Sequence, residues 1–244
     1  MMGEVERVPT GIPGLDPLIQ NGFAKGSANL VAGTPGTGKT IFCIQVLYNA
    51  ALQKKNCLFV SFEQSGEDIK KQMAQFGWEF EKATPYFKML ATTYDDPAFF
   101  QQLMAEVKNK KLDMVAIDSL ASIIIDPYDV FGSPDFGIMK MLKQGVNLPL
   151  DVSALSRMKV KKVIDTVKRS GATSLLTGEV IRQQGGFSRD TISDFLADSI
   201  ILLQHNPTAG ATNRTLTLEK MRLTKIDDLI HPLQITSQGI KLVG

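Results

Sequence analysis

A glycine-rich segment that ends in lysine and threonine carries the clearest chemical signature of this 244-residue chain. It satisfies the pattern G-x-x-x-x-G-K-[ST] in full. Its glycines let backbone N–H groups turn inward around phosphate oxygens. The lysine can reach the β- and γ-phosphates of a nucleotide, and the threonine hydroxyl can ligate Mg²⁺. We therefore predict a site for ATP and Mg²⁺ built by Gly33, Thr34, Pro35, Gly36, Thr37, Gly38, Lys39 and Thr40.

Two carboxylates that follow apolar runs could complete such a site. Asp118 closes the run 114–117, and a carboxylate at a strand end near a phosphate loop can hold Mg²⁺, directly or through water. Glu63 follows the run 57–62 and could polarise a water molecule for in-line attack on the γ-phosphate. From spacing alone, Glu63 could equally be a surface glutamate in a polar turn.

Three further polar residues give weaker signals. Thr177 ends the apolar run 174–177 and could either hydrogen-bond the γ-phosphate or simply cap the strand. Lys220 and Arg222 are two residues apart, so on a strand they share one face, which suits an anion. An arginine supplied by a neighbouring subunit can stabilise phosphoryl transfer. On pattern alone, a solvated basic strand is the simpler interpretation of this pair.

Strands and helices alternate along the chain and would position these residues. Short apolar runs predict buried strands, and apolar residues at helical spacing predict the helices between them. Strands are expected at 30–32, 57–62, 86–91, 114–117, 174–177 and 199–203, and helices at 41–52, 67–76, 97–110 and 153–169. This alternation predicts an α/β fold with a mostly parallel central sheet flanked by helices. Runs at 215–222 and 233–236 predict a β-rich C-terminal part.

The composition is ordinary for a soluble globular protein, and the length fits one large α/β domain or two small ones. Hydrophobic residues make up 43% and charged residues 21%, both ordinary values, and the net charge of +2 creates no strong field toward a membrane or nucleic acid. No apolar stretch is long enough to span a bilayer, and the first residues lack the apolar core of a signal peptide, so we expect a cytoplasmic protein without a membrane partner. The segment 126–152 is rich in proline and glycine and is predicted to be a flexible insertion loop.

Several of these segments, taken in order, resemble one known family. They are the opening Thr10–Asp16, the glycine-rich loop, Phe59–Glu63, Ile117–Ser119, Phe195–Asp198 and Lys220–Arg222. The chain resembles a single KaiC-type domain of the RecA/RadA-like ATPases, over nearly its whole length. The glycine-rich loop is common to many families, whereas the opening segment and the late Lys-x-Arg pair are specific to this one. The resemblance implies a RecA-like P-loop NTPase fold in a single domain over residues 1–244.

The resemblance also implies an assembly and roles for individual residues. KaiC-type domains form hexameric rings with ATP at the subunit interfaces, which would place Lys220 and Arg222 at the γ-phosphate of a neighbour. Glu63 would match the catalytic glutamate. KaiC commonly has two adjacent glutamates there, whereas this chain has Gln64 second. We therefore expect a homo-oligomeric, slow ATPase with a regulatory or signalling role, binding ATP and ADP.

Two alternatives stay open at this point. A RecA/RadA-like protein of recombination or repair would use ATP to control DNA binding, and the 126–152 segment with the basic helix 153–169 lies where recombinases place a DNA-contacting loop. The cations of that helix come without interleaved aromatic residues, and a charge run is usually a solvated face, so DNA binding is not favoured. A nucleotide-dependent scaffold without turnover is the third interpretation.

Overall fold

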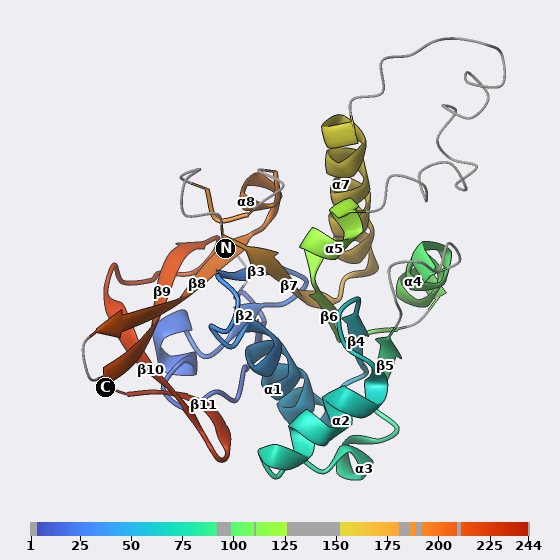
Figure 1. Cartoon of the computed structure of the whole chain (residues 1–244). Coiled ribbons are helices and arrows are strands. Elements are labelled where there is room, and N and C mark those ends of the chain that lie inside the picture. The colour runs from blue at the N-terminus through green and yellow to red at the C-terminus, as the bar shows by residue number, and fades with distance from the viewer. Residues whose placement is uncertain are drawn as a thin grey trace, which may run out of the picture.

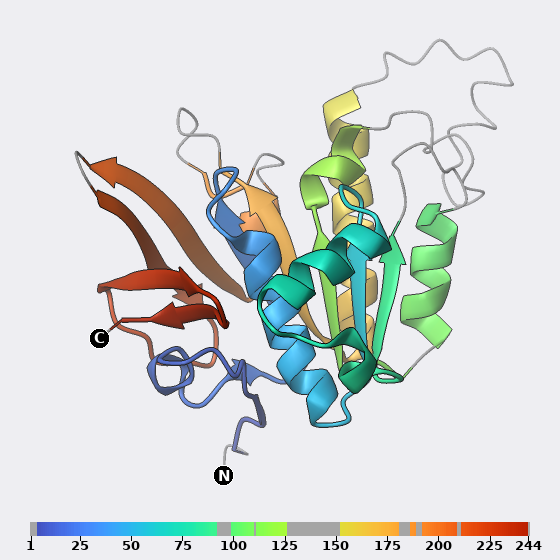
Figure 2. The ribbon, with the colours of Figure 1, turned by 60° about the horizontal axis from the view of Figure 1, so that its bottom comes forward.

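The computed structural model describes residues 4–91, 99–109, 111–125, 152–180, 186–188, 192–208 and 211–243. Its centre is a nine-stranded sheet with the strand order β11-β10-β9-β8-β3-β7-β6-β4-β5 (Figures 1 and 2). The strands from β8 to β5 in this order run parallel, and β9, β10 and β11 extend the sheet with antiparallel pairing. This arrangement confirms the predicted mostly parallel sheet and its β-rich C-terminal part.

Each apolar run of the sequence coincides with a strand, although β3, β7, β8, β9 and β10 are at least three residues longer than the predicted runs. The parallel strands are β3 (Ala28–Gly33), β4 (Cys57–Ser61), β5 (Phe87–Ala91), β6 (Met114–Asp118), β7 (Thr173–Glu179) and β8 (Ser199–Thr208). The antiparallel strands are β9 (Ala211–Met221), β10 (Ile230–Thr236) and β11 (Gly239–Leu242), and a separate two-stranded sheet joins β1 (Arg7–Val8) to β2 (Phe23–Ala24). The sequence patterns did not predict β1, β2 or β11, because each is too short to show a clear alternation.

Helices cover both faces of the sheet (Figure 2). One face carries α1 (Lys39–Leu52), α2 (Gly66–Gln75) and the short α3 (Phe80–Ala83), and the other carries α4 (Phe99–Asn109), α5 (Leu120–Ile125) and α7 (Val152–Ser170). Two single-turn elements, η1 (Asp16–Ile19) and α8 (Ser193–Leu196), complete the described helices. The four predicted helices correspond to α1, α2, α4 and α7, while the short elements were not predicted.

The continuous apolar runs arise because the central strands are buried on both faces. In β4, Cys57 and Phe59 belong to the core beneath α1, whereas Leu58 and Val60 pack in the core beneath α4 and α7. All five residues of β4 are buried. Burial on both sides removes the alternation of polar and apolar residues that a half-exposed strand would show.

The carboxylate of Asp16 holds the opening segment, Thr10–Asp16, in a turn. Asp16 accepts hydrogen bonds from the backbone and the hydroxyl of Thr10, at 2.8 and 2.7 Å, and from the backbone of Gly11 at 3.0 Å. Gly11 has a φ of +66°, and a Cβ there would lie 2.5 Å from Nδ2 of Asn49 in α1. The segment therefore needs glycine at this position to pack against α1.

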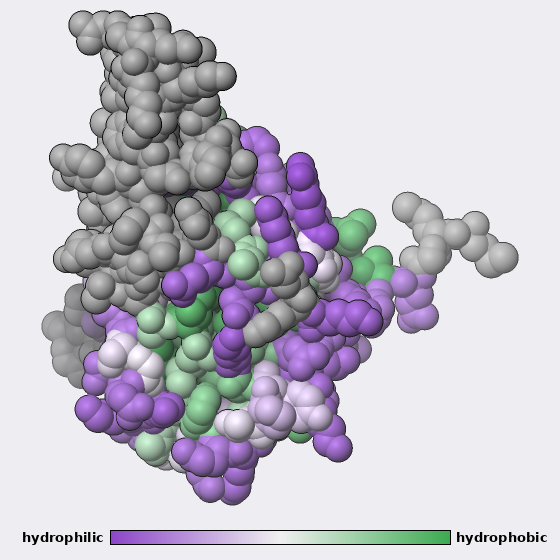
Figure 3. All heavy atoms as spheres, turned by 90° about the vertical axis from the view of Figure 1, so that its right-hand side faces the viewer, coloured by the Kyte–Doolittle hydropathy of each residue, from purple (hydrophilic) through white to green (hydrophobic). Residues whose placement is uncertain are grey.

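The strand β5, at one end of the strand order, carries a lysine that is paired with a neighbouring helix. Lys88 of β5 forms an ion pair with Glu106 of α4 at 2.7 Å. A lysine on an edge strand discourages pairing with another chain. On this side of the molecule, hydrophilic side chains surround a narrower band of hydrophobic ones (Figure 3).

Almost all of the predicted insertion lies outside the described residues. Of the segment 126–152, the structure describes only its last residue, Val152, which begins α7. Among the described helices, none combines the length and apolar character needed to cross a bilayer.

Candidate functional site

A cavity of about 390 Å³ opens where the parallel strands β3, β4 and β6 end. Ligands of open α/β sheets bind at this edge, outside the carboxyl ends of the strands. The structure brings most of the predicted site residues to this cavity, although they are up to 83 positions apart in the sequence. Those that line it are Pro35, Gly36, Gly38, Lys39, Thr40, Glu63 and Asp118.

The loop between β3 and α1 is shaped by its glycines and by its own lysine. Gly36 and Gly38 have φ angles of +78° and +104°, a conformation that side-chain-bearing residues rarely adopt. Lys39 donates from Nζ to the carbonyl oxygens of Gly33 at 2.9 Å and Thr34 at 3.1 Å. Burial lowers the pKa of the Lys39 ammonium, and the nearby carboxylates oppose this shift. A bound phosphate would offer this half-buried cation stronger acceptors than the two carbonyls.

Asp118 is held by two hydroxyl groups at the end of β6. Thr40 donates to Oδ2 at 2.6 Å, and Thr177 of β7 donates to Oδ1 at 2.6 Å. Burial raises the pKa of the Asp118 carboxyl, while these two hydrogen bonds act in the opposite direction. Thr177 is fully buried and does not line the cavity. It therefore orients Asp118, and direct contact of Thr177 with a phosphate stays a prediction.

Glu63 lies just beyond the end of β4, at the mouth of the cavity. Its Oε1 accepts hydrogen bonds from the hydroxyls of Ser119 at 2.7 Å and Ser122 at 3.3 Å. Oε2 accepts no hydrogen bond from any described residue. The two serines hold the carboxylate in place and leave one oxygen to orient a water molecule, which is what a general base requires.

The donor set suits Mg²⁺ rather than a transition metal. The threonine hydroxyl and the carboxylates around the cavity are hard oxygen ligands. Within the described part of the chain, no three His, Cys, Asp or Glu residues are grouped as a metal cage. Mg²⁺ typically uses only one or two protein carboxylates and takes its other ligands from water and phosphates. The residues present therefore fit a magnesium ion that arrives with a nucleotide.

Lys220 and Arg222 contact a different part of the chain. Lys220 donates from Nζ to the carbonyl oxygens of Ala197 at 2.7 Å and Asp194 at 3.0 Å. Arg222 follows the end of β9 and forms an ion pair from Nη1 to Asp198 at 3.1 Å. Neither residue lines the cavity of its own chain. Lys220 and Arg222 therefore lie on one segment, as predicted, but both lie away from the cavity of their own chain.

The sheet itself separates the pair from the cavity. Met221 pairs with Ser199 at the start of β8, and the backbone of Asp198 bonds Ala28 at the start of β3. The glycine-rich loop begins at Gly33, the last residue of β3, five residues beyond Ala28. At about 3.3 Å per residue the two edges are roughly 17–20 Å apart, so Arg222 cannot reach the cavity of its own chain.

Asp198 is the centre of a small polar cluster that holds Arg222. Its Oδ1 also accepts from Lys168 of α7 at 2.9 Å, and Oδ2 accepts from the backbone of Ala28 at 3.0 Å. Burial alone would raise the pKa of Asp198. The hydrogen bond from Ala28 and the contacts with the two cations outweigh burial, so the pKa lies below its ordinary value. The folded state is therefore stabilised by the ionised form.

We expect Asp198→Asn to lower the free energy of unfolding at neutral pH by about 1.5–3 kcal/mol, the contribution of a hydrogen bond to a charged group. The depressed pKa means that this stabilisation is present above about pH 4 and is lost as the pH falls through the folded-state pKa. Urea unfolding at neutral and acidic pH would measure this change. Asp165→Asn is the control, because the exposed pair of Asp165 with Lys161 is worth only about 0.3–0.5 kcal/mol. If Asp198→Asn and Asp165→Asn lowered the free energy of unfolding equally at neutral pH, the stabilising role of Asp198 would be contradicted.

The sequence interpretation missed several residues that line the cavity. Arg214 of β9 and Ile235 of β10 reach it because the antiparallel strands fold back beside the loop, and Gln72 reaches it from α2. A Cβ on Gly38 would lie only 3.1 Å from Cδ1 of Ile235. Nε of Arg214 is buried without a hydrogen-bond partner among the described residues. No local pattern marks these residues, since the pairing of distant strands brings them there.

Comparison with known proteins settles the family. A family model described as the KaiC ATPase matches residues 8–146 and 145–244, which together span almost the whole chain. The chain belongs to the KaiC ATPase family. This confirms the resemblance drawn from the opening segment, the P-loop and the Lys-x-Arg pair. It also confirms the RecA-like P-loop fold and makes a nucleotide the expected ligand of the cavity.

Relatives of two kinds match this KaiC-family chain. The circadian clock oscillator protein KaiC of Synechococcus elongatus is 26% identical over 252 residues, which cover 98% of this chain but 44% of that protein. The chain thus spans less than half the length of the KaiC relatives it matches. A UPF0273 protein of Methanocaldococcus jannaschii is 30% identical over 97% of this chain and 96% of its own length.

A solved structure supports the same assignment. The crystal structure of a KaiC-like protein from the hyperthermophilic archaeon Pyrococcus horikoshii superposes with a TM-score of 0.80 at 29% sequence identity. The match covers 99% of this chain and 100% of that one. The KaiC-like fold therefore includes the antiparallel strands that complete the cavity.

Proposed function

We propose that this chain is a Mg²⁺-dependent ATPase that works as a homo-oligomer in a regulatory or signalling role. The observation that carries the proposal is the convergence of Lys39, Thr40, Asp118 and Glu63 on one cavity at the edge of a parallel sheet. These are the parts that phosphoryl transfer requires: a cation for the phosphates, ligands for a metal ion and a base for water. The whole chain acts as one ATPase domain of the cytoplasm, where ATP and Mg²⁺ are available.

Each residue has a separate task in the proposed mechanism. Lys39 leaves the loop carbonyls and binds the β- and γ-phosphates, while backbone N–H groups of the loop surround them. Thr40 and Asp118 would hold Mg²⁺, which would neutralise charge on the phosphates when bound. Glu63, oriented by Ser119, accepts a proton from the attacking water.

A neighbouring subunit would complete this site. The cavity lies beyond the reach of Arg222 in the same chain, and the Arg222 side chain is 55% exposed, with Nη1 bound to Asp198. Two large apolar side chains beside the pair, Phe195 and Leu223, are 76% and 70% exposed. Exposed apolar groups next to charged ones are typical of a subunit contact. We propose a ring, a hexamer by analogy with the family, in which Lys220 and Arg222 contact the γ-phosphate bound by the next subunit.

Nucleotide binding through Lys39 is the first test. Lys39→Ala should weaken ATP binding by about ten- to a hundredfold, since a charge-assisted hydrogen bond contributes roughly 1.5–3 kcal/mol. Calorimetric titration with ATP and Mg²⁺ would measure the affinity, and Lys55→Ala, an exposed lysine outside the cavity, is the control. Unchanged affinity and unchanged hydrolysis in Lys39→Ala would exclude this cavity as the nucleotide site.

A further inference from the structure

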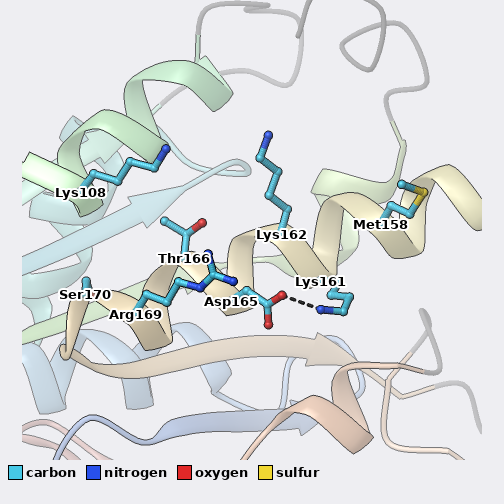
Figure 4. Close-up of a pocket in the computed structure, with 8 residues that line it drawn as sticks. All are labelled: Lys108, Met158, Lys161, Lys162, Asp165, Thr166, Arg169 and Ser170. Atoms are coloured by element: carbon cyan, nitrogen blue, oxygen red, sulfur yellow. Dashed lines mark hydrogen bonds and ion pairs between the residues drawn. The ribbon is translucent and has the colours of Figure 1, made fainter. Parts of the chain in front are cut away.

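A second hollow, of about 560 Å³, lies between α4 and α7 on the outer surface of the helices opposite α1 (Figure 4). Its wall on α7 is a stripe of residues three and four positions apart, formed by Met158, Lys161, Lys162, Asp165, Thr166 and Arg169. Residues with this spacing lie on one face of a helix. The opposite face of α7, which includes Val160 and Ile164, is buried in the core. The hollow is therefore a solvent-facing groove on a firmly anchored helix.

The groove is strongly cationic although the protein is not. α7 carries six cations and one acid, whereas the whole chain has a net charge of +2. Four cations line the groove, because Lys108 of α4 faces the stripe of α7 across it (Figure 4). The single acid, Asp165, forms a 2.6 Å ion pair with Lys161. Lys108 and Arg169 are exposed and form no ion pair with any described residue.

Helix electrostatics account for only part of this charge. Lys108 and Arg169 lie in the last turns of α4 and α7, where a cation interacts favourably with the helix dipole. Lys161 lies in the middle of α7, where the dipole offers no such gain. Gathering like charges around one hollow costs free energy that an anionic partner would offset. The charge therefore indicates a ligand with several negative groups.

An apolar contact beside the cations restricts the chemistry of that ligand. Met158 is 48% exposed at one end of the groove, and the lysine stems add further apolar surface. Exposed methionine adapts to the apolar side chains of protein partners. None of the described residues that line the groove is aromatic, so they offer no stacking platform of the kind typical of single-stranded nucleic acid sites. A peptide that carries both carboxylates and an apolar side chain fits these features better than a nucleic acid does.

We propose that the groove between α4 and α7 docks an acidic peptide segment of a partner protein. Carboxylates of the segment contact Lys108 and Arg169, and one apolar side chain packs on Met158. The groove shares no residue with the nucleotide cavity, so the segment can dock without displacing ATP. A partner could in this way be held on the outer surface of the proposed ATPase.

Fluorescence anisotropy of the full chain with a defined probe tests the proposal. The probe is a fluorescein-labelled peptide of glutamate and aspartate with one central leucine. We expect saturable binding that weakens with added salt, because the contacts are mainly between exposed charges. Lys108→Glu combined with Arg169→Glu should weaken binding by at least about tenfold, as expected when close charge pairs are lost. Met158→Asp should weaken it further.

Matched controls separate the groove from general charge effects. Lys55→Glu combined with Lys71→Glu makes the same change of net charge on exposed lysines outside the groove, and should weaken binding less than about threefold. All variants should keep the melting temperature and ATP turnover of the wild type. If the reversed charges destabilise α7, the neutral pair Lys108→Gln with Arg169→Gln should still weaken binding severalfold.

The proposal is overturned if the peptide shows no saturable binding up to about 1 mM, or if both double variants weaken it equally. Tighter, competing binding of a single-stranded oligothymidine would overturn it in favour of nucleic acid.

Discussion

Arg222→Ala should lower ATP turnover by roughly 10³–10⁵-fold while leaving ATP binding nearly intact. An arginine aimed at the γ-phosphate stabilises charge that develops in the transition state, so its loss affects the rate far more than the affinity. The phosphate loop of the same chain is unchanged in this variant and can still bind the nucleotide. Turnover and calorimetric ATP binding, measured on the same preparation of Arg222→Ala, would show whether the rate falls while the affinity is kept. Arg157→Ala, which removes an exposed arginine of α7, should have no effect.

Mixing two inactive variants tests whether Arg222 acts on a neighbour. Lys39→Ala lacks the lysine of the phosphate loop but keeps Arg222, and Arg222→Ala has the reverse defect. A mixed interface can pair an intact loop with an intact arginine, so the mixture should recover part of the activity. Wild-type specific activity should also fall on dilution, as interfaces dissociate. If mixed oligomers form, as shown by co-purification of differently tagged variants, and the mixture stays inactive, Arg222 does not act in trans.

Glu63→Gln should cut hydrolysis by about 10²–10⁴-fold, the range typical of a lost general base. Glutamine can still accept hydrogen bonds from Ser119 and Ser122, but its amide cannot take a proton from water. ATP affinity should change little, because Glu63 lies at the mouth of the cavity and not in the phosphate loop. Single-turnover hydrolysis with excess enzyme would measure the chemical step.

A nearby carboxylate provides the control for this substitution. Glu67 lies on α2, is exposed and pairs with Lys70. Glu67→Gln makes the same chemical change outside the cavity and should leave hydrolysis at the wild-type rate. Turnover at the parental rate in Glu63→Gln would remove Glu63 from the mechanism and leave Gln64 or another group as the candidate.

The central sheet was predictable from sequence because its strands are buried on both faces. Continuous apolar runs such as Cys57–Ser61 separate clearly from the polar helix surfaces between them. The glycine-rich loop was equally clear, since few other structures need those residues at that spacing. Asp118 and Glu63 could be placed near the loop because parallel strands end at one edge of the sheet.

The remaining parts of the site depend on contacts between distant residues. Arg214 and Ile235 reach the cavity through the antiparallel strands, whose pairing no local pattern specifies. The contact between Asp198 and Arg222 joins segments 24 residues apart, and the two serines that hold Glu63 lie after a different strand. The separation of Arg222 from its own cavity became visible only once the strand order was known. Strand order is set by the packing of the whole domain.

Steady-state phosphate release from ATP tests the central claim most directly. The wild-type chain, Glu63→Gln and Lys39→Ala would be compared in Mg²⁺ and in excess EDTA, at a concentration where oligomers are present by light scattering. We predict turnover by the wild type in Mg²⁺, loss of that turnover in EDTA, and near-background release by both variants. Phosphate release by the wild type that does not exceed release by the two variants, or that persists unchanged in EDTA, would contradict the assignment of a Mg²⁺-dependent ATPase to this cavity.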